Sequence, residues 1–105
     1  MALNGKKLGL VVCSAPEDPL FRHALGLAEA AVAEGLQVYL YYMDEGVRGL
    51  GDEKLKILQS RGANLFACAY SAQRRNIPIN DAATFSGLAW LSNLLAASDR
   101  FLLFP

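Results

Sequence analysis

Short, continuous apolar runs alternate with longer amphipathic segments along this chain. The runs have the length and composition of strands that are buried on both faces, as parallel sheets require. They span residues 8–13, 37–43, 64–67 and 101–104, with Cys68 at or just past the end of the third. The pattern therefore predicts at least four strands.

Helical signals fill the spaces between these runs. Asp18 and Pro19 are typical of a helix N-cap and first position, and Gly35 is placed to end that first helix. The apolar face of this helix recurs at helical spacing and comprises Leu20, Ala24, Leu27, Ala28 and Ala31. We expect Asp52 to begin a second helix that reaches about Ser60, and residues 84–98 to form a third. We expect loops over residues 44–51 and an irregular stretch over residues 69–83.

Alternation of strands and helices predicts an α/β fold, a three-layer α/β/α sandwich built on a small parallel sheet. In such sheets, ligands and reactive groups gather beyond the carboxyl ends of the strands. Loops 13–18, 44–51 and 68–83 meet at that edge.

Composition narrows the class of protein. The 105 residues are 53% hydrophobic, which suits one domain spanning residues 1–105. Ten basic and ten acidic residues balance, so nothing indicates direct binding to nucleic acid or to a membrane. The sequence shows neither a signal peptide nor a membrane span. We expect a cytoplasmic protein whose two cysteines are free thiols, with no cofactor.

Cys68 is the leading candidate for chemistry. It opens a long loop that also contains Arg74 and Arg75, and a nearby cation favours the nucleophilic thiolate. The alternative is a small buried apolar residue at a strand end, because free cysteine is among the most buried residue types.

Two other side chains should lie near the same edge. Cys13 ends the first strand, and we expect it roughly 10 Å from Cys68 if one strand lies between them. That separation exceeds the reach of a disulfide bond. We therefore favour a structural role for Cys13, with a resolving or relay thiol as the alternative. His23 could assist proton transfer or be a surface group. One histidine and two separated cysteines predict no metal site.

The segment GVRGLG, residues 46–51, invites a phosphate-loop interpretation, but the Gly-Lys-Ser/Thr ending and the dinucleotide fingerprint are absent. Asp44 at a strand end leaves a phospho-acceptor receiver domain as a weak alternative. Sensing of a small ligand or nucleotide at the sheet edge is a further low-ranked hypothesis.

The predicted last helix has no charged residue between positions 82 and 98. Its apolar positions cover much of its surface, and they are Phe85, Leu88, Ala89, Trp90, Leu91, Leu94 and Leu95. Such a helix needs cover on more than one side, so we expect a homo-oligomer with Trp90 near the contact. The alternative cover is the chain's own loop 68–83.

Three segments resemble the DsrE/DsrF/TusD sulfur-relay family. LFACAYSAQRRNIPIN (residues 65–80) is similar to the family's cysteine loop, with an apolar strand, a cysteine and a following arginine pair. HALGLAEAAVAEGLQVYLYYMDEGV (23–47) resembles its first helix and second strand, and GLAWLSNLLAASDRFLLF (87–104) its last helix and closing strand.

The resemblance implies a flavodoxin-like, five-stranded DsrE-like domain that assembles as a trimer or hexamer. It implies a sulfurtransferase-type protein in which Cys68 accepts sulfane sulfur as a persulfide from a donor protein and passes it to an acceptor. Arg74, Arg75, Cys13 and His23 are the residues we expect to assist binding there. The alternative within the family is a non-catalytic binding or assembly subunit.

Overall fold

The computed structural model describes residues 4–105, and its centre is a parallel sheet. The strands are β1 (Lys7–Val12), β2 (Gln37–Tyr42), β3 (Asn64–Cys68), β4 (Thr84–Ser86) and β5 (Arg100–Phe104). The helices are α1 (Pro19–Ala33), α2 (Glu53–Ser60), α3 (Ala69–Arg74) and α4 (Leu88–Ala97), with a 3₁₀ helix, η1 (Asp44–Gly49).

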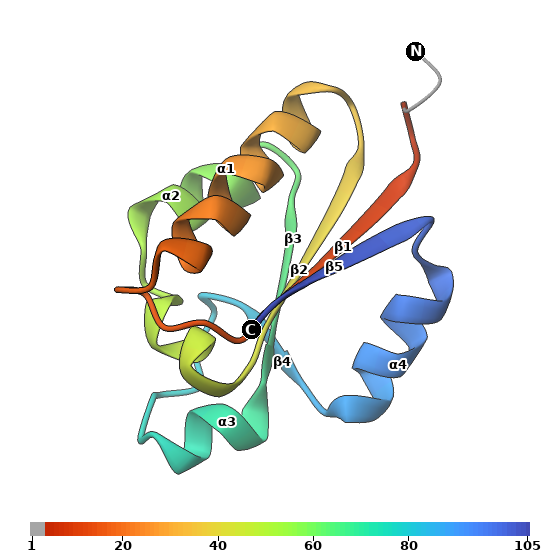
Figure 1. Ribbon diagram of the computed structural model, residues 1–105. Helices are drawn as coiled ribbons and strands as arrows, with labels where there is room; N and C mark the ends of the chain where they lie inside the picture. The colour runs from red at the N-terminus through yellow and green to blue at the C-terminus, as the bar shows by residue number, and fades with distance from the viewer. Residues whose placement is uncertain (1–3) are drawn as a thin grey trace.

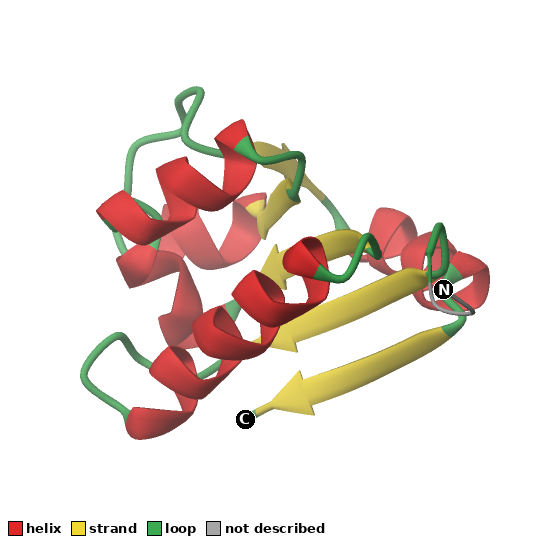
Figure 2. Cartoon of the chain, turned by 90° about the horizontal axis from the view of Figure 1, so that it is seen from above, coloured by secondary structure: helices red, strands yellow, loops and turns green. Residues whose placement is uncertain are grey.

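The five strands lie in the order β4-β3-β2-β1-β5, and every neighbouring pair is parallel. Figure 2 shows neighbouring strands pointing in the same direction. Because all strands are parallel, their carboxyl ends lie along one edge. The predicted α/β/α sandwich is confirmed, with a fifth strand beyond the four that the apolar runs indicate.

Helices cover the two faces of the sheet unequally. Figure 1 shows α1 and α2 on one side and α4 on the other. The first face carries the larger core, in which the strands pack on Phe21, Leu25 and other apolar residues of α1 and on Leu55 and Leu58 of α2. The opposite face has a smaller buried cluster of Tyr41, Cys68 and Leu94.

Local sequence explains the first half of the fold. Asp18 caps α1 by accepting a hydrogen bond from the Leu20 N–H at 2.9 Å, and Pro19 follows at the first helical position. Asp52 caps α2 in the same way through Lys54 N–H at 2.8 Å. Gly35 has φ +86°, a left-handed conformation that glycine adopts without steric cost.

Three expectations for local structure are wrong. The stretch from Ala69 begins with α3 instead of an irregular loop. Residues 44–49 form a 3₁₀ helix. The segment 84–98 is not one helix, because β4 occupies its first residues and Gly87 separates β4 from α4. Pairing of β4 with β3 outweighs the helical spacing of Phe85, a tertiary effect that local pattern does not contain.

The apolar residues predicted to form one stripe on the last helix are divided between α4 and β4, and they differ in burial. Leu94 is its one buried residue, Trp90 and Leu91 pack beside it, and Leu88 is 60% exposed. Phe85 lies on β4 and packs against the larger core. Among the helices of residues 4–105, none is long and apolar enough to cross a membrane.

Candidate functional site

The carboxyl ends of β1, β2 and β3 bring Cys13, Asp44 and Cys68 to one edge of the sheet. β2 lies between β1 and β3, and Met43 N–H donates to Val12 C=O at 3.0 Å, which aligns the first two strand ends. The predicted meeting of the three loops is therefore confirmed. Both cysteines are free thiols.

Cys68 is both the last residue of β3 and the N-cap of α3. Its backbone is extended, and its Sγ accepts a hydrogen bond from Ser71 N–H at 3.4 Å. Ser71 is itself buried, and its Oγ accepts from Asp44 N–H at 3.0 Å. One serine thus connects the cysteine to the loop that follows β2.

The Cys68 side chain is 4% exposed. It belongs to the buried cluster with Tyr41 and Leu94, to which Phe66 and Trp90 add partly buried aromatic rings whose centroids lie 4.2 Å apart. In a single subunit the sulfur is therefore enclosed mainly by apolar groups and by the backbone of α3.

Tyr41 and Ser86 each place a hydroxyl group on the Cys68 side of the sheet. Tyr41 Oη donates toward the carbonyls of Ser86 and Gly87 at 3.4 and 3.3 Å. Burial raises the pKa of Tyr41, and the neighbouring Cys68 sulfur raises it further, against a lowering contact with Ser86. Ser86 pairs with Cys68 in the β3–β4 register, and its Oγ is buried without a hydrogen-bond partner among the residues that the structure describes.

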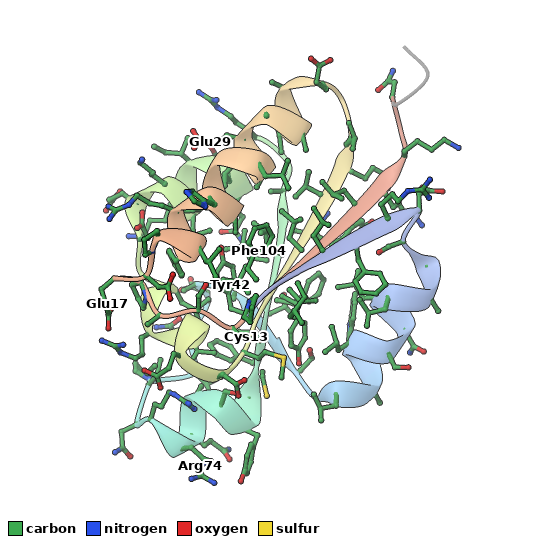
Figure 3. The ribbon with its side chains drawn as sticks, in the orientation of Figure 1. Cys13, Glu17, Glu29, Tyr42, Arg74 and Phe104 are labelled. Carbon is green, nitrogen blue, oxygen red and sulfur yellow. The ribbon has the colours of Figure 1, made fainter. Side chains whose placement is uncertain are left out.

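The predicted arginines are directed elsewhere. Arg75 Nε bonds Glu45 Oε2 at 2.7 Å, and its Nη1 donates to Ser71 C=O at 3.2 Å, so it ties α3 to η1. Arg74 donates to Tyr70 Oη at 3.0 Å on the outer face of α3, where Figure 3 shows it pointing away from the sheet. Within residues 4–105, neither guanidinium makes a hydrogen bond to Cys68.

Cys13 lies beside a carboxylate, that of Asp44. Burial, the charge of Asp44 and a hydrogen bond to its carboxylate raise the pKa of the Cys13 thiol to about 11. Cys13, labelled in Figure 3, is half-buried and follows β1, and its N–H donates to Phe104 C=O at 2.8 Å at the end of the edge strand β5. A thiol with such a pKa is protonated at neutral pH and is a weak nucleophile.

His23 and the glycines do not join this site. His23 is exposed on α1, which covers the face opposite Cys68. Gly46 and Gly49 serve packing, since a Cβ at Gly46 would lie 2.3 Å from Val12 O and one at Gly49 would lie 2.2 Å from a ring atom of Phe21. No group of three metal-ligating side chains occurs within the described part of the chain.

The sequence reasoning missed three residues beside Cys68: Tyr41, Ser71 and Ser86. Alternation along β2 was the available signal for Tyr41, because residues two apart share a face, and Tyr39 and Tyr41 flank a fully buried leucine. The positions of Ser71 and Ser86 depend on α3 and β4, which were not predicted. The resulting arrangement offers one thiol with a backbone donor and two hydroxyls around it.

Comparisons with known proteins agree with this fold. The DsrE/DsrF-like family model matches residues 6–104. Among solved structures, the ychN protein from E. coli superposes with a TM-score of 0.82 at 20% identity, covering 95% of this chain and 99% of that protein. No curated protein sequence matches the chain significantly. Since the family model spans nearly all of it, the chain belongs to the DsrE/DsrF-like family.

Proposed function

We propose that this protein is a sulfur carrier that holds sulfane sulfur as a persulfide on Cys68 and passes it to the thiol of a partner protein. The observation that carries the proposal is the position of Cys68, at the carboxyl end of a central strand with Ser71 N–H donating to its sulfur. Membership of a family associated with sulfur relay supports it.

The chemistry needs no cofactor and no net oxidation. The Cys68 thiolate attacks the outer sulfur of a donor persulfide, R–S–SH, and the donor S–S bond breaks. The products are Cys68–S–SH and the donor thiolate, R–S⁻, which takes the electron pair. An acceptor thiolate then attacks the outer sulfur of Cys68–S–SH, forms its own persulfide and releases the Cys68 thiolate.

The burial of Cys68 protects its sulfur from solvent, and it also blocks the approach of a partner thiol. At 4% exposure the sulfur is protected from bulk solvent, which suits a persulfide that must survive between partners. The same enclosure requires that Leu94, Trp90 or the α3 segment move when a donor or acceptor thiol arrives. Sulfur transfer by this chain therefore depends on local opening.

Sulfur loading tests the proposal directly. The protein is incubated with a protein or small-molecule persulfide, and its intact mass is measured under non-reducing conditions. We expect a gain of one sulfur atom in the wild type and in Cys13→Ser, reversed by dithiothreitol, and no gain in Cys68→Ser. A wild type that gains no sulfur, or a Cys68→Ser variant that gains as much, contradicts persulfide transfer on Cys68.

A second candidate is a non-catalytic binding or assembly subunit of the same family. It is favoured by the enclosed thiol and by the engagement of Arg74 and Arg75 with Tyr70 and Glu45. Under this function, Cys68→Ser leaves both association and partner binding unchanged. Retention of a partner protein by the Cys68→Ser variant, without sulfur uptake by the wild type, distinguishes it.

Self-association is part of the proposal. Three large apolar side chains of β5 are exposed, Phe101 (51%), Leu102 (46%) and Leu103 (59%), and so is Leu88 (60%) at the start of α4. Because β5 is an edge strand, it also presents unpaired backbone groups. A second copy would cover these apolar side chains and the strand edge, and we propose a trimer or hexamer, as the family resemblance implies. Light scattering at micromolar concentration gives the mass, and a monomer contradicts this part.

A further inference from the structure

The hydroxyl of Tyr41 has a proton without a strong acceptor. A typical hydroxyl hydrogen bond is about 2.7–2.8 Å long. The two carbonyl oxygens within reach of Tyr41 Oη, those of Ser86 and Gly87, lie at 3.4 and 3.3 Å. One proton cannot point well at both. In a residue that is 0% exposed, water does not supply the missing acceptor.

The sulfur of Cys68 is a further acceptor in the surroundings of this hydroxyl. Tyr41 and Cys68 share one face of the sheet and one buried cluster. Their proximity also shows in the pKa of Tyr41, which is raised by burial and then by Cys68. Hydrogen bonds to an ionised group are shorter and about twice as strong as those between neutral groups. Formation of the thiolate would therefore draw the Tyr41 proton away from the carbonyls.

Ser86 offers a second donor at the same place. It is paired with Cys68 across the β3–β4 ladder, so the two side chains emerge on the same face of the sheet. Its hydroxyl is buried and has no partner within residues 4–105. A buried hydroxyl left unsatisfied costs free energy that an arriving acceptor removes. A negative charge on sulfur is such an acceptor.

We propose that Tyr41 Oη, with Ser86 Oγ as a second donor, stabilises negative charge on the Cys68 sulfur when it acts as nucleophile and again when it acts as leaving group. The inference rests on the proposed sulfur transfer. In the second transfer step the S–S bond of Cys68–S–SH breaks and the electron pair stays on Sγ. The donated hydrogen bonds lower the energy of that leaving thiolate, and no proton has to be transferred to it.

Alkylation of Cys68 by iodoacetamide as a function of pH tests this role without any sulfur donor. In a Cys13→Ser background only Cys68 reacts. The variants are Tyr41→Phe and Ser86→Ala, and Tyr39→Phe is the matched control, because Tyr39 lies on the same strand and face but donates to Gln37. Circular dichroism confirms that each variant is folded.

We expect Tyr41→Phe to be alkylated about fivefold more slowly at pH 7. Loss of one hydrogen bond to a charged group reduces the thiolate population more than tenfold, and the greater nucleophilicity of the unsupported thiolate offsets part of that loss. At high pH, where the thiol ionises without help, the variant should equal or exceed its parent. Ser86→Ala should follow the same pattern with a smaller, roughly twofold, effect, as for a hydrogen bond of lesser strength.

The outcomes separate this inference from the proposed function. If Tyr41→Phe follows the pH profile of Tyr39→Phe, or if Cys68 in the parent is never alkylated, the inference is overturned. If Tyr41→Phe does not fold, Ser86→Ala decides, and a profile identical to that of the parent overturns it. If the pH crossover appears but the wild type takes up no sulfur, the donors stand and the transfer function fails.

Discussion

Replacement of Asp44 by asparagine should make Cys13 more reactive. Burial, the Asp44 charge and an Asp44 hydrogen bond raise the pKa of Cys13 from the ordinary value of 9.0 to about 11. The thiol is an acid, so a raised pKa favours its neutral form, and the thiolate fraction at neutral pH falls about 100-fold. Removing the carboxylate charge lowers the pKa and shifts the pH profile of Cys13 alkylation toward lower pH.

The size of the effect can be bounded from the three causes. Burial is the largest, so it accounts for at least a third of the rise, and the two contributions of Asp44 together account for at most two thirds. Two thirds of a 100-fold change in population, taken on the logarithmic scale, is a factor of about 20. Because asparagine can still form a hydrogen bond with the thiol, the expected increase is severalfold and below this limit.

The assay is the rate of Cys13 alkylation at pH 8 in a Cys68→Ser background. Glu45→Gln is the control, since it removes the adjacent carboxylate, whose own pKa is lowered mainly by its hydrogen bond with Arg75. An Asp44→Asn rate equal to the Glu45→Gln rate, or lower than the parent rate, would refute the electrostatic account.

Three further predictions concern packing, the backbone and association. Leu94→Ala should lower the free energy of unfolding in urea by about 3 kcal/mol and speed native-state alkylation of Cys68, because it removes part of the cover over the sulfur; an unchanged alkylation rate argues against Leu94 as that cover. Gly46→Ala should lower the free energy of unfolding by about 2 kcal/mol, because its Cβ would lie 2.3 Å from a backbone oxygen. Gly26→Ala has open space around its Cβ and should raise the free energy of unfolding by about 0.5–1 kcal/mol. Equal effects of the two substitutions would contradict the steric clash at Gly46. Leu88→Glu should reduce the mass measured by light scattering without lowering the unfolding midpoint, and an unchanged mass places the contact elsewhere.

The first two thirds of the fold can be predicted from local sequence, because the capping residues and apolar runs there determine the helix and strand in which they lie. Asp18 with Pro19, and Asp52, cap α1 and α2 as expected, and the apolar runs become β1, β2 and β3. The elements directly after Cys68, α3 and β4, cannot be predicted in this way. Cysteine is not a usual N-cap, so the start of α3 gave no signal, and β4 owes its existence to pairing with β3 rather than to its own three residues.

The candidate site likewise contains one residue that the sequence predicts and others that it does not. Cys68 was identified because a strand end and a family resemblance coincide there. The roles expected for Arg74 and Arg75 came from their nearness along the chain, but α3 turns one guanidinium toward Tyr70 and the other toward Glu45. The hydroxyl of Tyr41 is 27 residues away from Cys68 in sequence, and only strand register brings the two together.

The three-residue strand β4 has a consequence for kinetics. It is the shortest strand of the sheet, it lies at an edge, and its last residue is the register neighbour of Cys68. Elements with few pairings fray at a free energy far below that of global unfolding. We therefore expect the rate of Cys68 modification to be the product of a fraying pre-equilibrium and an intrinsic rate. Amide hydrogen exchange at residues 84–86 and thiol modification should consequently respond in parallel to low concentrations of urea.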